Sequence, residues 1–499
     1  MHTASLGRRF WALWLILLAA KAILAWRLPL FGDEAWYWLE GQHLAWAYSD
    51  LPGLTGWLAR FGVETAGHSE FALRWPFLAL GMAVPLLVRA AARRAFGADA
   101  GNQAGVLALW LPLLGGLGFL ALPDVPLTLA AAMCLNATLR LIDRVDAAGL
   151  SCLALGLVLG ALSHYRFAPL ILAGALGLAL DPRGRRVLRV ARVWVAIGLG
   201  AVAWWPLWLW NQQQLGAGVQ FQLAERHPWT LHGEGIWLPL SQLVVVTPLL
   251  LWLLLVTLHA VWRRWRAHDT GPWGVILGAA GLPLAMYLTL AFVADRERVS
   301  FHWLLQAWLP LLVVAPTVFG QWSRGWRVAT QMLAALGLVL LLGYAHLAAS
   351  PAARTSLAGS AWYPDNFAGW HEIAAMLRAM PEVASGASDV VADNFKLGAQ
   401  LAFALQRPDL PMLDHRLNHK HGRAAQLRLW ELEHALDRPQ ARPRLLVVED
   451  SAVPEHDKQA YYQSLRSRAP SLTLRQELRV DEGAKRFLVF AVDAPPPAP

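Results

Sequence analysis

The sequence is poor in cysteine and in charge, and both shortages limit what the protein can be. Cysteine occurs only at Cys134 and Cys152, inside apolar stretches, so we expect neither a disulfide framework nor a cysteine metal site. Only 15% of the 499 residues are charged, 56% are hydrophobic, and the mean hydropathy is +0.38. These values are atypical of soluble enzymes and indicate a polytopic membrane protein.

Features of nucleic-acid-binding proteins are also missing. The net charge is +9 and the isoelectric point is near 9.9, but no separate basic segment is interleaved with aromatic residues. The arginines cluster between apolar stretches, as the positive-inside rule describes for membrane proteins. We therefore expect membrane lipids, and no nucleic acid, as partners.

A small-residue cleavage site is missing after the first apolar run, which follows Arg8 and Arg9. The run is therefore interpreted as an uncleaved first transmembrane helix rather than a signal peptide. Eleven apolar stretches approach the length that a membrane span requires. They lie near residues 10–28, 71–90, 104–122, 126–143, 149–164, 167–182, 193–210, 238–262, 273–293, 302–319 and 328–348.

The fifth and sixth stretches are separated only by Ser163–Arg166, which is interpreted as a tight turn at the membrane surface. With this turn, every dense arginine cluster falls on one side of the membrane, and that side is predicted to be cytoplasmic together with the N-terminus. Residues 1–348 are thus expected to form an α-helical transmembrane domain of about 11 helices with a periplasmic loop at 29–70.

The remaining sequence changes character. Ala361–Met380 has helical periodicity, and three short apolar runs are predicted to be strands: Ser388–Asp393, Arg444–Glu449 and Arg486–Val492. This pattern predicts a small C-terminal α/β domain over 349–493 on the periplasmic side, followed by a disordered proline-rich tail at 494–499.

Two adjacent carboxylates, Asp33 and Glu34, lie where the first helix is expected to leave the membrane. Acidic side chains at that depth are costly, which favours a functional role. Trp36, Tyr37 and Trp38 follow directly, as interfacial aromatic residues do. The alternative is a solvated loop flanked by such residues.

The predicted cytoplasmic connections are short and almost purely basic, whereas the outer connections carry both acidic and basic residues. Arginines there can hold a phosphate, one carboxylate can act as a general base, and a second can bind a divalent metal ion. This combination suits group transfer from a phosphate-linked donor. Structural alternatives remain: Asp124 as a helix N-cap, Arg74 and Arg166 as snorkelling residues, and His302 with Trp303 as interfacial residues.

The segment Asp33-Glu34-Ala-Trp-Tyr37 resembles the DEAxY signature of GT-C glycosyltransferases related to protein O-mannosyltransferases and the bacterial aminoarabinose transferase of lipid A. Further family motifs follow in order, some with a substitution. They are Tyr48–Pro52 (Y-x-D-x-P-P, with Gly53 as the last residue), Arg74–Pro76 (R-x-P), Pro123–Pro126 (T-P-D-A-P, with Leu122 first), Ser163–Tyr165 (S-K-Y), Trp210-Asn211 (W-N), His302-Trp303 and Val391–Asn394 (V-A-D-N).

The resemblance implies an inverting membrane enzyme that takes a hexose or pentose from a polyprenyl-phosphate-linked donor. The acceptor would be lipid A, another glycan or lipid, or a protein, at the periplasmic face of the bacterial inner membrane. Asp33 would match the catalytic carboxylate. The family lysine that contacts the donor phosphate is His164 here, and Arg166 is its candidate replacement.

The site predicted from these motifs and from the outer arginines has three parts. The catalytic residues are Asp33 and Glu34, and the candidate metal ligands are Asp124 and Glu34. The substrate-binding residues are Tyr37, Asp50, Arg74, Asp124, His164, Tyr165, Arg166, Asn211, Arg226, Arg298 and His302.

Two other functions remain as alternatives. A transporter or flippase of lipid-linked glycans would be expected to have inverted repeats and helices broken in mid-span, and neither is evident. A ligase or polymerase of surface polysaccharide would share the topology, but the ordered Asp-Glu and Pro-Asp motifs argue against it.

Overall fold

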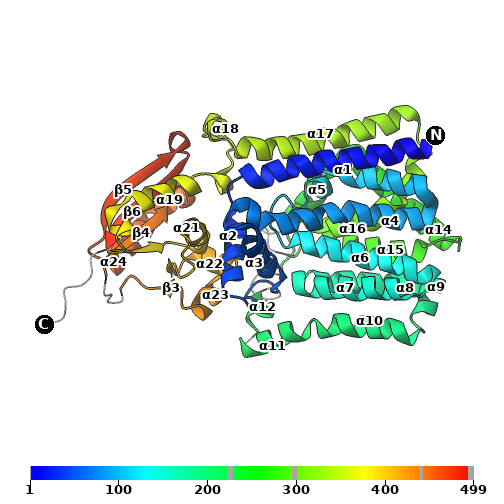
Figure 1. The fold of residues 1–499 in the computed structure, drawn as a ribbon, viewed down its shortest axis with the longest axis horizontal. Helices are drawn as coiled ribbons and strands as arrows, with labels where there is room; N and C mark the ends of the chain where they lie inside the picture. Colours follow the sequence, from blue (N-terminus) through cyan, green and yellow to red (C-terminus); the bar gives the residue numbers. More distant parts are fainter. Residues whose placement is uncertain (1, 215, 222–228, 295–299, 438–441, 493–499) are drawn as a thin grey trace. The chain divides into compact units, whose positions relative to one another are not determined.

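The structure is a computed structural model that describes residues 2–214, 216–221, 229–294, 300–437 and 442–492. The chain forms two compact units (Figure 1). The first unit comprises Met1–Ala25, Leu51–Thr55 and Arg74–Gly343, and the second comprises Trp26–Asp50, Gly56–Leu73 and Tyr344–Pro499.

The regular structure of the first unit consists mainly of helices. Its helices are α1 (His2–Arg27), α4 (Glu70–Trp110), α5 (Pro112–Gly115), α6 (Asp124–Asp143), α7 (Ala147–Ser163), α8 (Phe167–Leu180), α9 (Pro182–Val187), α10 (Ala191–Val202), α11 (Trp205–Gln213), α12 (Ala217–Gln220), α13 (Trp237–Val245), α14 (Pro248–Arg266), α15 (Trp273–Leu290), α16 (Leu305–Phe319) and α17 (Arg324–Ala348), with 3-10 turns η2 (Gly233–Ile236) and η3 (Phe301–Leu304). The last residues of α1 and α17 and the first residues of α4 belong to the second unit, and the first residues of α3 belong to the first.

Helices occupy all or part of each of the eleven apolar stretches, but the count of eleven spans is not confirmed. Among the described residues, seven helices are long and apolar enough to cross a membrane, or eight if α13 and α14, bent by 110°, form one span. Helices α7 and α8 have 17 and 14 residues and are shorter than such a span.

Two interruptions in the helices separate neighbouring apolar stretches that are nearly continuous in the structure or in the sequence. Gly97 has φ 89°, a conformation that glycine adopts readily, and it interrupts the 41-residue α4 between the second and third predicted stretches. The predicted turn at Ser163–Arg166 is confirmed, because α7 ends at Ser163, His164 is extended, and α8 begins at Phe167.

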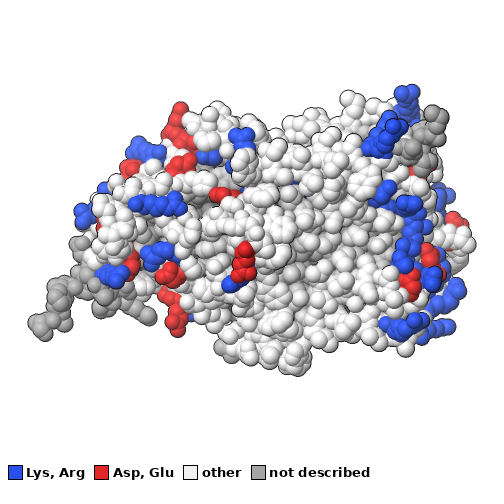
Figure 2. Space-filling model, viewed as in Figure 1, with Lys and Arg blue, Asp and Glu red and all other residues white. Residues whose placement is uncertain are grey.

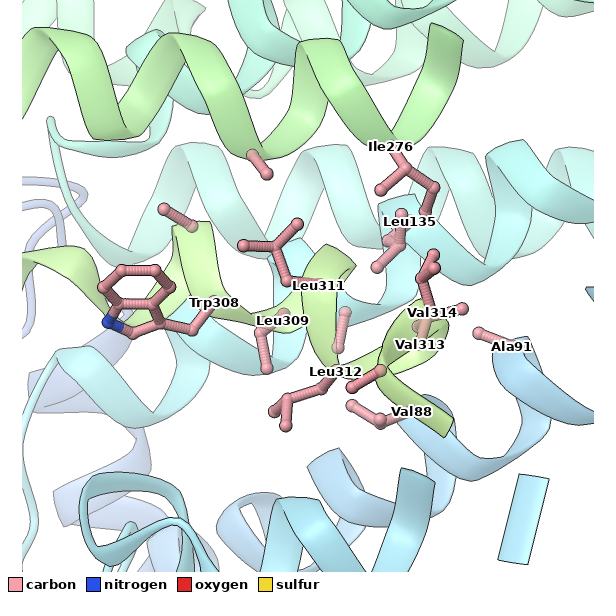
Figure 3. Close-up of a cluster of buried hydrophobic side chains, with 14 of the residues drawn as sticks. Val88, Ala91, Leu135, Ile276, Trp308, Leu309, Leu311, Leu312, Val313 and Val314 are labelled. Carbon is pink, nitrogen blue, oxygen red and sulfur yellow. The ribbon is translucent and has the colours of Figure 1, made fainter. Parts of the chain in front are cut away.

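Helix α16 forms the centre of the apolar core in the first unit. It is apolar around nearly its whole circumference, and such helices are buried by their neighbours. It packs against α6, α14 and α15. Figure 3 shows side chains of this core from four helices: Val88 and Ala91 of α4, Leu135 of α6, Ile276 of α15, and Trp308, Leu309, Leu311, Leu312, Val313 and Val314 of α16.

The second unit combines helices with one mixed sheet. Its helices are α2 (Gly32–Gln42), α3 (Leu54–Ala66), α18 (Pro351–Ser356), α19 (Trp370–Ala379), α20 (Pro381–Ala384), α21 (Phe395–Leu405), α22 (Arg416–Lys420), α23 (Ala424–Leu429) and α24 (Lys458–Arg468), with 3-10 turns η4 (Asp365–Phe367), η5 (Asp450–Ala452), η6 (Glu455–Asp457) and η7 (Asp481–Gly483). The sequence assigned loop 29–70 to the transmembrane domain, whereas most of that loop packs with the C-terminal residues in this unit.

The sheet has six strands in the order β3-β2-β1-β4-β6-β5. The strands are β1 (Asp389–Ala392), β2 (Met412–Leu413), β3 (Glu433–His434), β4 (Arg444–Glu449), β5 (Thr473–Val480) and β6 (Lys485–Val492). Strands β3, β2, β1 and β4 are parallel, and β6 and β5 are antiparallel to their neighbours. The apolar residues of β1 and β4 are buried, which is typical of parallel strands covered on both faces. The three predicted strands correspond to β1, β4 and β6.

The basic side chains of the first unit are concentrated at one end of its helices. Figure 2 shows Lys and Arg gathered at the end where the chain begins in Figure 1. This concentration agrees with the arginine pattern, which predicts that end to be cytoplasmic.

We therefore predict that a topology reporter fused after residue 350 is periplasmic, because α17 runs from the arginine-rich end to the opposite end of the helices. A matched fusion after Arg266, in the basic last turn of α14, should report the cytoplasm. Paired alkaline phosphatase and fluorescent-protein fusions measure both positions. A cytoplasmic signal from the fusion after residue 350 would overturn the predicted orientation.

Candidate active site

Helix α2 begins at the Asp-Glu motif, and Glu34 helps to form that beginning. The backbone N–H of Phe31 donates to Glu34 Oε2 at 2.9 Å, which is the half of a capping box that a glutamate in the first turn supplies, whereas the Phe31 side chain has no acceptor for the other half. The Glu34 side chain is fully buried. One of its oxygens thus satisfies a backbone donor at the helix start, and its catalytic and metal-binding roles stay predictions.

The aromatic residues after the motif are buried in protein, which corrects the interpretation of them as interfacial residues. The side chains of Trp36, Tyr37 and Trp38 are at most 4% exposed. The Trp36 ring packs edge-on against Phe395 at 5.5 Å, and Trp38 packs in the same way against Phe403 at 5.4 Å. Both partners belong to α21, so α2 buries its aromatic face against the C-terminal part of the second unit.

Arg423, just before α23, contacts three carboxylates of the first outer loop. Its Nη2 lies 3.7 Å from Asp33 Oδ1, its Nη1 lies 3.3 Å from Glu40 Oε1, and the same Nη1 forms a close ion pair with Asp50 Oδ2. The side chains of Glu40, Asp50 and Arg423 are 0%, 6% and 4% exposed, whereas that of Asp33 is 32% exposed. Asp33 is therefore the carboxylate of this cluster that solvent or a substrate reaches most readily.

Aromatic rings surround the same guanidinium. Its carbon lies 4.9 Å from the Trp36 ring centroid, 5.6 Å from Tyr37 and 5.7 Å from Phe395. Cation–π attraction of this kind strengthens when the cation is desolvated. The rings and carboxylates together fix the position of Arg423.

Burial and charge act against each other in this cluster. Burial raises the pKa of Glu40 well above its usual range, the charge of Asp50 raises it further, and Arg423 opposes both effects. Burial also raises the pKa of Asp50, again against the influence of Arg423. For Arg423 itself burial lowers the pKa, but Asp50 and the other nearby groups outweigh burial and raise it overall. Arg423 therefore offsets only part of the effect of burial on the pKa values of these two carboxyl groups.

Further hydrogen bonds hold the segment before Asp50 to the residues around Arg423. The backbone N–H of Ser49 donates to Gln426 Oε1 at 2.9 Å, and the Ser49 hydroxyl donates to the Gly422 carbonyl at 2.5 Å. The Tyr48 hydroxyl donates to the Glu40 carbonyl at 2.7 Å, which ties the loop back to α2. The Y-x-D-x-P motif thus positions Asp50 beside Arg423.

A second group of predicted residues lies in the first unit, centred on Asp124 at the start of α6. Arg166 Nη2 donates to Asp124 Oδ1 at 2.7 Å, and His302 Nε2 lies 3.5 Å from Asp124 Oδ2. Arg166 Nε lies 3.2 Å from His164 Nε2, and its guanidinium carbon is 5.8 Å from the Trp303 ring. The ion pair is mostly buried, with side chains 12% and 14% exposed.

Tyr165 and Asn211 extend the predicted set in the first unit. Asn211 Nδ2 donates to the Tyr165 hydroxyl at 3.1 Å, and Asn211 Oδ1 accepts from the Val219 backbone at 3.0 Å. Arg166 Nη1 is buried and has no hydrogen-bond partner among the described residues. An anion near Arg166 would satisfy this donor.

Three arginines of the predicted site, Arg74, Arg226 and Arg298, belong to neither of these two groups. Arg74 is fully buried and donates from Nη1 to the Ala25 carbonyl at 3.1 Å, so the snorkelling interpretation of Arg74 is wrong. Its guanidinium satisfies a carbonyl in the last turn of α1. Arg226 and Arg298 lie outside the described residues.

Sequence reasoning missed Glu40 and Arg423. For Glu40 a local signal exists, because it lies seven residues after Asp33 and therefore on the same face of α2. Within α2, Glu40 also accepts a hydrogen bond from Trp36, whose Nε1 lies 2.8 Å from Glu40 Oε1. Arg423 lies 383 positions away from Glu40, and no local pattern connects the two.

Comparison with solved structures identifies the fold. ArnT from Cupriavidus metallidurans in the apo state matches with a TM-score of 0.69 and 15% identity, covering 98% of each chain. The same protein bound to undecaprenyl phosphate matches with a TM-score of 0.68 and 16% identity, again covering 98% of each chain. This chain has the ArnT-like GT-C fold. The predicted fold class is confirmed, apart from the number of spans.

Sequence comparisons agree with the ArnT-like fold. The family model described as dolichyl-phosphate-mannose-protein mannosyltransferase matches residues 50–210. Lipid A galacturonosyltransferase RgtD of Rhizobium johnstonii is 26% identical over 309 residues, which are 60% of this chain and 63% of RgtD. The match thus spans less than two thirds of that relative. The resemblance that the ordered motifs indicated is confirmed.

The Arg423 cluster predicts a pH-dependent loss of stability when the cation is removed. In Arg423→Met the pKa values of Glu40 and Asp50 should rise further. A raised folded-state pKa contributes stability at low pH that is lost as the pH rises through it. The substitution should therefore lower the free energy of unfolding more at about pH 8 than at about pH 5. At the higher pH the decrease should be about 3–5 kcal/mol.

Thermal unfolding of the full-length protein at both pH values measures this difference. Arg428→Met is the matched control, because Arg428 lies on the adjoining α23 with a side chain 54% exposed and pairs with Glu433. The control should unfold close to the unsubstituted protein at both pH values. Equal destabilisation of Arg423→Met at both pH values would contradict the electrostatic role of Arg423.

Proposed function

We propose that this protein is a membrane glycosyltransferase that moves a sugar from a polyprenyl-phosphate-linked donor to an acceptor, with inversion at the anomeric carbon. Three similarities support the proposal: the ArnT-like fold, the mannosyltransferase family model over residues 50–210, and the relative RgtD, a lipid A galacturonosyltransferase. One of the similar ArnT structures holds undecaprenyl phosphate, which supports a polyprenyl phosphate carrier.

The observation that carries the proposal is the position of Asp33. It lies at the first turn of α2, and its partly exposed side chain contacts a buried arginine. A general base must reach its substrate and still be held in one orientation. Asp33 meets both conditions, whereas Glu40 and Asp50 are enclosed in protein.

In the proposed reaction, Asp33 takes the proton of an acceptor hydroxyl. The hydroxyl oxygen forms a bond to the anomeric carbon of the donor while the bond from that carbon to the phosphate oxygen breaks. The polyprenyl phosphate leaves with the bonding electron pair, and attack from the opposite face inverts the anomeric centre. Arg423 acts through Asp33 as a positioning residue.

Arg166 is the residue we propose for contact with the donor phosphate. Its buried Nη1 has no hydrogen-bond partner among the described residues, and a guanidinium suits phosphate oxygens. The Asp124 carboxylate and the Trp303 ring hold the guanidinium in place. His164, at the position of the family lysine, contributes a ring that orients Arg166. Tyr165, Asn211 and His302 complete the polar surroundings.

The predicted metal ligands do not fit a metal site in the part of the chain that is described. That part contains no group of three or more His, Cys, Asp or Glu side chains suited to a metal ion. Asp124 is paired with a guanidinium, and Glu34 accepts from a backbone N–H. A divalent cation beside Asp124 would be repelled by Arg166. No step of the proposed reaction uses a metal ion.

The finer properties of the reaction are proposals as well. We place the enzyme in the bacterial inner membrane, with transfer at the periplasmic face and lipid A or another envelope glycan or lipid as the acceptor. The relative RgtD, which acts on lipid A by its name, supports a lipid-linked acceptor.

Replacing Asp33 by asparagine should lower sugar transfer by roughly 10²–10⁴-fold, because the amide cannot take the acceptor proton. Mass spectrometry of envelope lipids and glycans identifies the product lost when the gene is absent. The same product is then quantified in cells expressing Asp33→Asn.

The control is Asp409→Asn, which changes a side chain that is 73% exposed and lies in the same unit. The control should restore the product fully, and immunoblots should show equal membrane levels of both variants. Full product formation by Asp33→Asn would refute the assignment of Asp33 as the base.

A further inference from the structure

The parallel strands of the second unit end at one edge of the sheet, and a cavity of about 660 Å³ lies there. Asp393 and Asn394 directly follow β1, and Glu449 is the last residue of β4; all three line the cavity. From β1 the chain passes through α21 to β2 on one side, while β4 pairs with the other side of β1. Ligands bind α/β sheets at such a topological switch point.

Two buried carboxyl groups form the floor of this cavity. Asp393 and Glu449 are each 1% exposed. Glu449 Oε1 pairs closely with Lys485, but Glu449 Oε2 has no hydrogen-bond partner among the described residues. A buried acceptor without a donor is costly to stability. A hydroxyl group of a bound ligand would supply the missing donor.

The neighbouring Asp393 complements Glu449. Its oxygens accept from Asn394 Nδ2 at 2.6 Å and from the Tyr461 hydroxyl at 3.3 Å. Burial and the charge of Glu449 raise the pKa of Asp393 to about 8, so the Asp393 carboxyl can act as a hydrogen-bond donor near neutral pH, while Glu449 Oε2 is an acceptor without a partner among the described residues. A donor next to an acceptor matches the hydroxyl group of a sugar, which both donates and accepts hydrogen bonds.

The charge of the lining argues against an anionic ligand. Five acidic residues line the cavity, against three basic ones. The acidic residues are Asp33, Asp393, Asp414, Glu449 and Asp457, and the basic ones are Lys396, Arg416 and Arg468. The volume is within the range of roughly 300–1,000 Å³ that small-molecule sites occupy.

We propose that this cavity binds a sugar residue through its hydroxyl groups, with Glu449 and Asp393 as the primary contacts. Because Asp33 also lines the cavity, a sugar bound there would be held next to the proposed base. The sugar would then belong to a glycan acceptor. The assignment of this sugar to the acceptor rests on the proposed function, whereas the binding of a sugar in the cavity does not.

A substitution that fills the cavity tests the proposal without changing its floor. Ser464 lies on α24, is exposed and lines the cavity, whereas the adjacent Gln463 is exposed and does not line it. Ser464→Trp should block the cavity, and Gln463→Trp is the matched control. Saturation-transfer NMR on full-length protein in nanodiscs, with no donor present, measures binding of chitobiose, a soluble neutral disaccharide.

We expect chitobiose to bind the unsubstituted protein and Gln463→Trp, and to bind Ser464→Trp at least about tenfold more weakly. Equal binding to Ser464→Trp, or absence of binding to the unsubstituted protein, would overturn the proposal. Displacement of chitobiose by an equal concentration of inorganic phosphate would overturn the assignment to hydroxyl groups.

The two proposals fail separately. If chitobiose binding follows the expected pattern but the gene makes no difference to envelope glycans, the cavity stands and the glycosyltransferase assignment fails. If transfer depends on Asp33 but Ser464→Trp binds chitobiose as well as Gln463→Trp does, the transferase stands and the cavity is not the sugar site.

Discussion

The buried ion cluster of Arg423 joins two distant parts of the chain into one unit. A single guanidinium contacts Asp33, Glu40 and Asp50, all from the first outer loop, and lies against aromatic rings of α2 and α21. Buried charges persist only when they are paired, and here one cation serves several acids. The loop and the C-terminal residues are therefore parts of one structure, and the proposed base is held in place by a residue from the C-terminal part.

The two groups of predicted site residues differ in their electrostatic balance. In the second unit three carboxylates share one cation, and Asp33 is the most exposed of the three. In the first unit Arg166 is balanced by Asp124 and keeps one unsatisfied donor among the described residues. The first arrangement suits a base and the second suits an anion, as transfer from a phosphate-linked donor requires.

Much of the fold follows from local patterns in the sequence. The apolar stretches became helices, and the apolar runs at 388–393, 444–449 and 486–492 became β1, β4 and β6. Strands β2 and β3 have two residues each, too few to show a pattern, and β5 is polar because most of its residues are exposed at the sheet edge. The number of spans was not predictable, because short helices such as α8 carry the same apolar signal as full spans.

The candidate site was predictable only where the residues lie within recognisable motifs. Asp33, Asp50, Asp124 and Asn211 lie in motifs whose order indicated the family. Arg423 lies in no such motif, and its contacts arise only when the C-terminal residues pack on α2. The same packing explains why Trp36 and its neighbours are buried in protein, since an aromatic run looks alike in sequence whether lipid or protein covers it.

The role of Arg423 is tested most directly by a double-mutant cycle with Glu40, read out as the rate of sugar transfer. If Arg423 supports the site by compensating buried carboxylates, Glu40→Gln should partly restore the activity lost in Arg423→Met. The activation free energy of sugar transfer in the double variant should then rise by at least about 1 kcal/mol less than the sum of the rises in the two single variants. Additive losses would contradict the account, because they would mean that Arg423 and Glu40 act independently.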